Sequence, residues 1–183
     1  MKKIVISTGG TGGHVIPAQV LYDYISDKND VVITSDSRAI NYLDKNKYKI
    51  KKIDVPKISK NVLNFIPFLI LFTISIIKSF FFLHKKKIKI LISTGGYMSI
   101  PICLAARMLK IKILLIEPNL VLGRANLCLL NYCNKIFTYS KNIKNLPEKM
   151  KYKNFVIKPL IRKDIFLAKN KLEKKTTKFS MLI

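Results

Sequence analysis

The sequence predicts an α/β protein built on a doubly wound parallel sheet. Short, continuous apolar runs alternate with longer segments along the chain, and strands that are buried on both faces of a parallel sheet have this character. Two of the runs, residues 2–6 and 88–92, lead directly into glycine-rich turns, STGGTGGHVIP at 7–17 and STGGYMSIP at 93–101. Two strand–turn–helix units of this kind bring their turns to the same edge of one sheet.

The boundaries of the elements follow from where the apolar runs begin and end. The expected strands are residues 3–7, 31–35, 48–55, 88–93, 112–116, 135–139 and 154–158. The helices expected between them are residues 14–26, 37–45, 98–109, 124–133 and 140–146. The first apolar run is too short for a secretory signal and enters the glycine turn at once, so we expect a first strand and a cytoplasmic protein.

The C-terminal part of the chain changes character. We expect one domain over residues 1–166, followed by a linker at 167–178, which is polar and charged and lacks bulky apolar spacing. The last residues, FSMLI at 179–183, look like the first strand of a truncated second domain. We therefore expect the chain to be a fragment.

A long apolar segment at residues 62–84 interrupts the alternation of strands and helices. It is long enough to span a bilayer, but a proline and a lysine interrupt it, and it lies where a crossover helix of the sheet belongs. A true span would put the two halves of the sheet on opposite sides of the membrane. We expect instead a helix that lies on the membrane surface, flanked by Lys57, Lys60, Lys78 and the lysines at 85–87. An ordinary buried helix and a true span are the alternatives.

The chain is strongly basic, with 34 Lys and Arg against 10 Asp and Glu and a formal charge of +24. Such an excess indicates nucleic acid or an acidic membrane as the partner. A coding bias toward A/T-rich codons, which favour Lys, Ile and Asn, explains much of it equally well. The sequence lacks the basic and aromatic modules that bind single-stranded nucleic acid, so an anionic membrane is the better partner.

Three motifs occur in order along the chain: GGTGGHVIPA at 9–18, STGGYMSIP at 93–101 and IEPNLVLGRANLCL at 116–129. Together they resemble the MurG family of peptidoglycan glycosyltransferases, family 28, over the whole chain. The resemblance implies a GT-B fold of two Rossmann-like domains, of which this chain would be the N-terminal, acceptor-binding half. It also implies transfer of N-acetylglucosamine from UDP-N-acetylglucosamine to lipid I, giving lipid II, by a peripheral protein at the cytoplasmic face of the bacterial inner membrane.

Within this resemblance, the first glycine turn lies at the reacting centre. Thr11, Gly12 and Gly13 match the turn that reaches toward the donor sugar, and only glycine lets a backbone approach a ligand this closely. His14 follows at the start of a helix, and we predict that it is the general base for the acceptor hydroxyl, or the group that positions that base. The alternatives are a plain strand–helix turn and a histidine that only caps the helix.

The remaining candidates follow the second and third motifs. Tyr97 matches the family's GGY motif and is an expected acceptor contact. Glu117 and Asn119 are retained where the family usually has HEQN, although its His and Gln are missing here; we expect a catalytic carboxylate and a donor contact. Asn126 is a further expected acceptor contact, and Arg162 an expected donor contact in a segment that departs from the family's NPVR. The alternatives are a tyrosine that packs the turn, polar residues that cap the loop, and a solvated arginine.

The implied reaction is an inverting displacement that needs no cofactor and no metal ion. The sequence has no Asp-x-Asp motif, and its three cysteines lack zinc-ligand spacing and are expected to be reduced, buried thiols. Helix N-termini and basic groups, mostly in the second domain, would stabilise the diphosphate that leaves. The fragment alone is therefore expected to be inactive. Other cell-wall synthesis proteins are expected as further partners, and nucleic acid is not.

Two other functions fit less of the sequence. A stand-alone module that binds a polyprenyl-diphosphate lipid at the membrane would need no second domain. An NAD-type oxidoreductase would need an acidic residue about 20 residues beyond the glycine turn, and Asp36 lies near that place. Its turn, however, departs from the G-x-G-x-x-G spacing, and nothing downstream resembles a hydride-transfer site.

Overall fold

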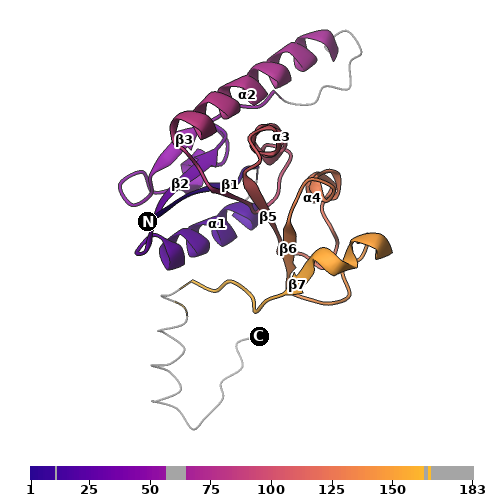
Figure 1. Ribbon diagram of the computed structural model, residues 1–183. Helices are drawn as coiled ribbons and strands as arrows, with labels where there is room; N and C mark the ends of the chain where they lie inside the picture. Colours follow the sequence, from indigo (N-terminus) through magenta and orange to yellow (C-terminus); the bar gives the residue numbers. More distant parts are fainter. Residues whose placement is uncertain (11, 57–64, 163–164, 166–183) are drawn as a thin grey trace, which may run out of the picture.

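The computed structural model describes residues 1–10, 12–56, 65–162 and 165. They form a parallel seven-stranded sheet in the order β3-β2-β1-β4-β5-β6-β7 (Figure 1). The strands are β1 (Lys2–Ser7), β2 (Asn29–Ser35), β3 (Ile50–Lys52), β4 (Ile90–Ser93), β5 (Lys112–Glu117), β6 (Lys135–Thr138) and β7 (Asn154–Val156). The chain runs outward from β1 to β3, returns to the centre at β4 and continues outward on the other side to β7. This topology confirms the predicted doubly wound class and puts a switch point between β1 and β4.

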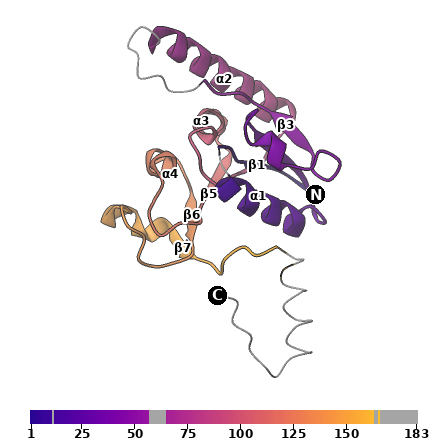
Figure 2. The same cartoon turned by 180° about the vertical axis from the view of Figure 1, so that it is seen from behind.

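Helices cover both faces of the sheet. They are α1 (Gly12–Ile25), α2 (Phe65–Lys85), α3 (Ser99–Met108), α4 (Arg124–Leu129) and the 3₁₀ helices η1 (Ile40–Tyr42) and η3 (Glu148–Lys153). α1 lies on one face, and α2, α3 and α4 lie on the other (Figures 1 and 2). β1 contributes to both cores, because Ile4 and Ile6 belong to the cluster that includes α1 residues, while Val5 belongs to the cluster that includes α3 residues.

The seven predicted strands are all present, but two segments beside β2 are less regular than expected. The predicted strand at 48–55 is reduced to Ile50–Lys52. The predicted helix at 37–45 is wrong, because only the short 3₁₀ helix η1 forms there. Asp36 caps this turn, since its buried carboxylate accepts a hydrogen bond from the backbone N–H of Ala39 (3.1 Å). The helical geometry nevertheless ends at Leu43, whose backbone is extended.

The predicted helix at 140–146 is also wrong. Lys144 instead pairs with the loop after β5, since its N–H donates to the carbonyl of Leu120 (2.9 Å) and its carbonyl accepts from Leu122 (2.9 Å). This backbone pairing satisfies the polar groups that a helix would otherwise satisfy. The predicted helix at 124–133 is present but short, because α4 ends at Leu129 and a turn follows.

Two of the three cysteines are buried, as expected. Burial raises the pKa of the Cys103 and Cys133 thiols, so both are poor nucleophiles. Cys128 is exposed, so the expectation of a buried thiol is wrong there. Its place on the short helix α4, beside the exposed Leu127, accounts for the exposure.

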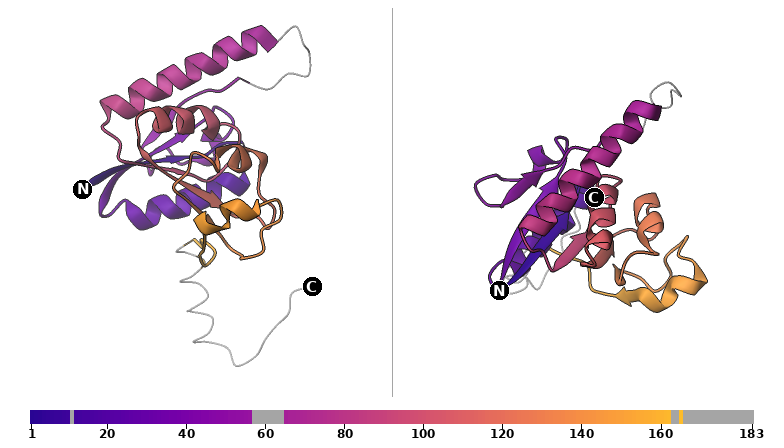
Figure 3. Two further views of the ribbon diagram at one scale, coloured as in Figure 1. Left: turned by 45° about the vertical axis from the view of Figure 1, so that its right-hand side comes forward. Right: turned by 45° about the horizontal axis from the view of Figure 1, so that its top comes forward.

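Helix α2 has its apolar side chains on the outside. It is long and apolar enough to cross a membrane by length and composition, with a mean hydropathy of 2.2, yet only 17% of its most apolar window is buried. The residues that it buries, Ser75, Ser79 and Leu83, recur every four positions and form one narrow stripe. The N-terminal half of the helix projects beyond the sheet (Figure 3). The alternative of an ordinary buried helix is therefore wrong. Residues 62–64, Lys57 and Lys60 lie outside the described residues.

The two glycine turns touch each other at the switch point. A Cβ on Gly96, whose φ is +82°, would lie 2.8 Å from the carbonyl oxygen of Gly9, and a Cβ on Gly9 would lie 2.8 Å from the side chain of Met98. Real Cβ atoms do not approach other atoms this closely, so both positions need glycine. The contact fixes the turn after β1 against the turn after β4.

We expect Gly96→Ala to lower the free energy of unfolding by about 1–3 kcal/mol, because the new methyl group meets backbone in a left-handed conformation. Gly12→Ala is the matched control. Apart from the chain neighbours of Gly12 and the backbone of its own helix, no described atom lies within 4 Å of the Cβ position there. This change should therefore be neutral or stabilise by up to about 1 kcal/mol. Urea denaturation followed by circular dichroism measures both. Equal effects of the two substitutions would contradict the contact.

Candidate active site

The carboxyl ends of β1, β4 and β5 surround a cleft at the switch point, where open α/β sheets bind their ligands. Its volume is about 210 Å³. The residues that line it are His14, Gly95, Gly96, Tyr97, Glu117, Gly123, Arg124, Ala125 and Asn126. Residues of the three sequence motifs, at 9–18, 93–101 and 116–129, therefore meet in one cleft. The cleft brings together His14, Tyr97, Glu117 and Asn126 from the predicted site residues.

His14 is held in one orientation by the second glycine turn. Its Nδ1 lies 2.8 Å from the carbonyl oxygen of Thr94, and the hydroxyl of Thr94 donates to the carbonyl of His14 (2.9 Å). Gly95 leaves room for the ring, since a Cβ there would lie 2.9 Å from Nδ1 and Cε1. A carbonyl oxygen only accepts, so Nδ1 carries a proton and Nε2 of the neutral ring is the nitrogen that accepts one. The ring is held by Thr94, which follows the neighbouring strand β4, and not only by contacts within its own helix.

Glu117 is fully buried and organises the loop that follows β5. Its Oε1 accepts from the backbone N–H (3.2 Å) and the side-chain amide (2.9 Å) of Asn119. Its Oε2 accepts from the N–H of Gly123 (2.8 Å) and the amide of Asn126 (3.0 Å). These four hydrogen bonds are the ones expected if Glu117 only caps the loop, which was the alternative to a catalytic role. A catalytic role for Glu117 stays a prediction, and the arrangement gives it a structural role as well.

We expect Glu117→Ala to lower the free energy of unfolding by about 2–4 kcal/mol, because four hydrogen-bond donors lose their acceptor at a buried site. Glu148→Ala is the matched control. Its side chain is 85% exposed and pairs with Lys151 at the surface, so this change should stay within about 0.5 kcal/mol. Chemical denaturation measures both. A Glu117 variant as stable as the control would contradict the buried network.

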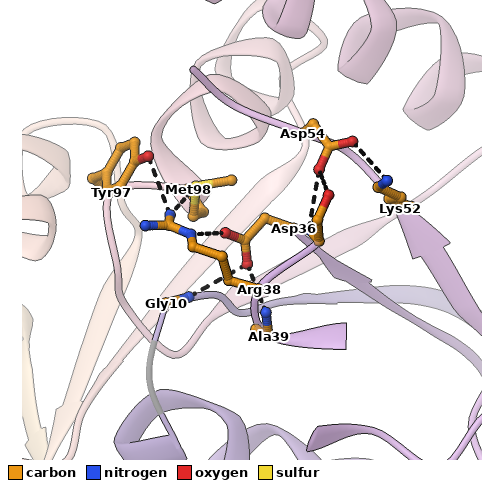
Figure 4. A network of polar contacts seen from close by, with 9 residues as sticks. Gly10, Asp36, Arg38, Ala39, Lys52, Asp54, Tyr97 and Met98 are labelled. Atoms are coloured by element: carbon orange, nitrogen blue, oxygen red, sulfur yellow. Dashed lines mark hydrogen bonds and ion pairs between the residues drawn. The ribbon is translucent and has the colours of Figure 1, made fainter. Parts of the chain in front are cut away.

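An arginine that sequence reasoning missed stands beside the cleft. Arg38 binds Asp36 through an ion pair of 2.6 Å and donates to the hydroxyl of Tyr97 (3.1 Å), as Figure 4 shows. The sequence suggests Asp36 as the acid of a nicotinamide site, but its carboxylate is occupied by Arg38 and by the N–H of Ala39. The signal available in the sequence was the polar run SDSR at the carboxyl end of the strand next to a glycine turn.

The residues predicted to contact the donor do not lie together in one site. Gly12 and Gly13 belong to the first turn of α1, directly before His14, and are not among the residues that line the cleft; Thr11 lies outside the described residues. Asn119 is exposed and is bound to Glu117. Arg162 lines a separate hollow of about 700 Å³ beside α1, together with Gln19 and Tyr42. The structure therefore does not bring Arg162 to the glycine turns.

A doubly wound sheet with its cleft at the switch point defines a Rossmann-like domain. Comparisons with known proteins identify it as an N-terminal domain of the GT-B type. Residues 4–138 match the Glycosyltransferase family 28 N-terminal domain. The chain belongs to glycosyltransferase family 28, as its motifs predicted. It is 55% identical over 166 residues to a protein of Pelagibacter ubique named UDP-N-acetylglucosamine–N-acetylmuramyl-(pentapeptide) pyrophosphoryl-undecaprenol N-acetylglucosamine transferase, in a match that covers 90% of this chain and 46% of the relative. A protein of the same name from Rickettsia canadensis is 35% identical over the same shares.

Solved structures show the same fold. The crystal structure of MurG from Acinetobacter baumannii superposes with a TM-score of 0.74 at 20% identity, over 99% of this chain and 51% of that one. A UDP-GlcNAc 2-epimerase from Neisseria meningitidis superposes with a TM-score of 0.59 at 18% identity, over 93% of this chain and 50% of that one. The chain spans about half the length of the relatives that it matches.

Proposed function

We propose that this chain is the acceptor-binding half of an enzyme that transfers N-acetylglucosamine from UDP-N-acetylglucosamine to N-acetylmuramyl-(pentapeptide) pyrophosphoryl-undecaprenol, the lipid I of peptidoglycan synthesis. The name of the 55% identical relative supports the substrates. The observation that carries the chemistry is the bond between His14 Nδ1 and Thr94, which leaves Nε2 as a proton acceptor in the cleft.

In this mechanism a hydroxyl group of the acceptor sugar attacks the anomeric carbon of N-acetylglucosamine. The new glycosidic bond forms as the bond to UDP breaks, with inversion at the anomeric carbon, and the hydroxyl proton passes to His14 Nε2. Tyr97 and Asn126 contact the acceptor. Glu117 supports this step by holding the loop after β5, and with it the amide of Asn126, in place.

The donor would lie across the first glycine turn and a second domain. Gly12 and Gly13 lie at the start of α1, whose N-terminal dipole favours the negative charge that develops on the departing diphosphate. Thr11, which lies outside the described residues, is proposed as a further donor contact. Asn119 and Arg162 are the other proposed donor contacts. Because Arg162 lies in a separate hollow, its contact would require the segment after β7 to move when the donor binds.

We further propose that α2 docks the protein on an anionic membrane, which would place it at the cytoplasmic face of the inner membrane. Ile66, Ile70 and Phe81 are among the apolar side chains that α2 exposes, and Lys78 and Lys85 on the same helix suit acidic headgroups. Other cell-wall synthesis proteins remain proposed partners, without a surface assigned to them.

The test is an assay of the two halves. A chimaera in which residues 1–166 replace the matched segment of the Pelagibacter ubique relative should transfer radiolabelled N-acetylglucosamine to the lipid acceptor, and the 183-residue chain alone should not. Product formation by the chain alone would overturn the division of labour. An inactive, folded chimaera whose N-terminal half still binds the acceptor would favour the lipid-binding module instead.

A further inference from the structure

Arg38 links the turns that follow three neighbouring strands, β2, β1 and β4 (Figure 4). Its Nε donates to Oδ2 of Asp36 at 2.6 Å, and its Nη2 donates to the hydroxyl of Tyr97 at 3.1 Å. The same Nη2 lies 3.2 Å from the sulfur of Met98, whose side chain packs against Gly9. A single side chain from the end of β2 therefore touches the second glycine turn and, through Asp36 and Met98, the first.

The aspartate that holds Arg38 is itself fixed. Asp36 is 3% exposed, and its Oδ1 accepts from the N–H of Ala39 at 3.1 Å and, over a long 3.5 Å, from Gly10. The carboxylate raises the pKa of the Arg38 guanidinium, so the side chain stays charged. The guanidinium also lies 5.3 Å from the centre of the Tyr97 ring, which adds a cation–π contact. Arg38 is thus anchored on one side and presents its fork to Tyr97 on the other.

The hydrogen bond from Arg38 restricts what the hydroxyl of Tyr97 can do. A guanidinium has five N–H donors and no acceptor, so the oxygen of Tyr97 must accept the bond from Arg38. The phenolic proton then points elsewhere, and Tyr97 lines the cleft that also contains His14. The hydroxyl of Tyr97 is therefore left to donate its own proton to an acceptor other than Arg38.

We propose that Arg38 is a positioning residue, which fixes Tyr97 so that its hydroxyl donates to an oxygen of the acceptor's sugar or diphosphate. This inference rests on the proposed function, since it requires the acceptor to enter the cleft. Arg38, held by Asp36, would affect the acceptor only through Tyr97, so the effects of substitutions at Arg38 and Tyr97 on acceptor binding should be coupled. Removal of Arg38 should weaken acceptor binding only while the hydroxyl of Tyr97 is present.

The experiment is a double-mutant cycle on the 183-residue chain. The probe is a short-prenyl analogue of N-acetylmuramyl-(pentapeptide) pyrophosphoryl-undecaprenol, and its affinity is measured by titration calorimetry. We expect Tyr97→Phe and Arg38→Met each to weaken binding about 3- to 10-fold, and the double variant to bind no more weakly than the weaker single variant. Arg107→Met, at the exposed end of α3, is the matched control and should bind as wild type does.

The outcomes separate the two proposals. Arg38→Met is compared in two backgrounds, wild type and Tyr97→Phe. An equal loss of binding in both would show a purely structural role and overturn this inference alone, and so would normal binding by the Arg38→Met variant. A wild-type chain that fails to bind the probe would overturn the acceptor-binding function and this inference with it. Should Arg38→Met not fold, Arg38→Lys closes the cycle, because lysine keeps the charge beside Asp36 but lacks the fork that reaches Tyr97.

Discussion

Replacement of His14 by alanine should reduce kcat of the two-domain chimaera by about 10²- to 10⁴-fold, the usual contribution of a general base. The reason lies in the tautomer. Because Nδ1 donates to Thr94, the ring offers Nε2 to the acceptor hydroxyl, and alanine removes the group to which this geometry assigns the proton. Binding of the acceptor should change much less, since the contacts from Tyr97 and Asn126 remain. The measurement is steady-state transfer of labelled N-acetylglucosamine in detergent.

The chain offers a matched control for this substitution. It contains two histidines, and the second, His84, is exposed at the C-terminal end of α2 and does not line the cleft. His84→Ala should leave kcat within about twofold of wild type. His14→Ala also loses one hydrogen bond, so its urea midpoint should be compared with wild type to exclude unfolding. A folded His14→Ala variant with near-normal turnover would remove the catalytic role.

The fold was accessible from the sequence because periodicity and glycine report on backbone geometry. Continuous apolar runs predicted all seven strands, and the glycines at 9–10 and 95–96 predicted two turns at one edge. Two predicted helices fail. At 37–45 only the short 3₁₀ helix η1 forms, and the backbone is extended from Leu43. At 140–146 the amino acids suit a helix, but backbone hydrogen bonds join Lys144 to Leu120 and Leu122 in the loop after β5. Such competing contacts come from tertiary structure and leave no periodic signal.

The site was predictable only in part, for a related reason. His14, Tyr97, Glu117 and Asn126 follow motifs, and the sheet topology brings them to one cleft. Which side chain fixes which cannot be read from spacing. Arg38 and Tyr97 are 59 residues apart and meet only because β2, β1 and β4 are neighbours. Glu117 illustrates the opposite case, since a motif marked it as catalytic while the structure shows it bound to its own loop.

Aspartate at Ile66 and Ile70 should weaken binding of the chain to anionic vesicles by about 100-fold or more. These side chains are 69% and 56% exposed and lie one turn apart on the half of α2 that projects from the sheet (Figure 3). Burial of an isoleucine in the membrane is worth about 2 kcal/mol, and the introduced carboxylates add repulsion from acidic lipids. Stability should hardly change, because neither side chain contributes to the core. Vesicle flotation measures the binding.

The control must separate lost apolar contact from altered charge. Tyr152 and Val156 are 74% and 46% exposed near β7, at the opposite edge of the sheet from β3, and aspartate at both changes the net charge by the same amount. If α2 docks by its apolar face, this pair should float almost as wild type does, and raising the salt from about 0.1 M to about 1 M should weaken wild-type binding without abolishing it. Equal losses in the two pairs would mean that the chain's charge of +24 holds it to the vesicle and that the outward apolar face of α2 has another partner.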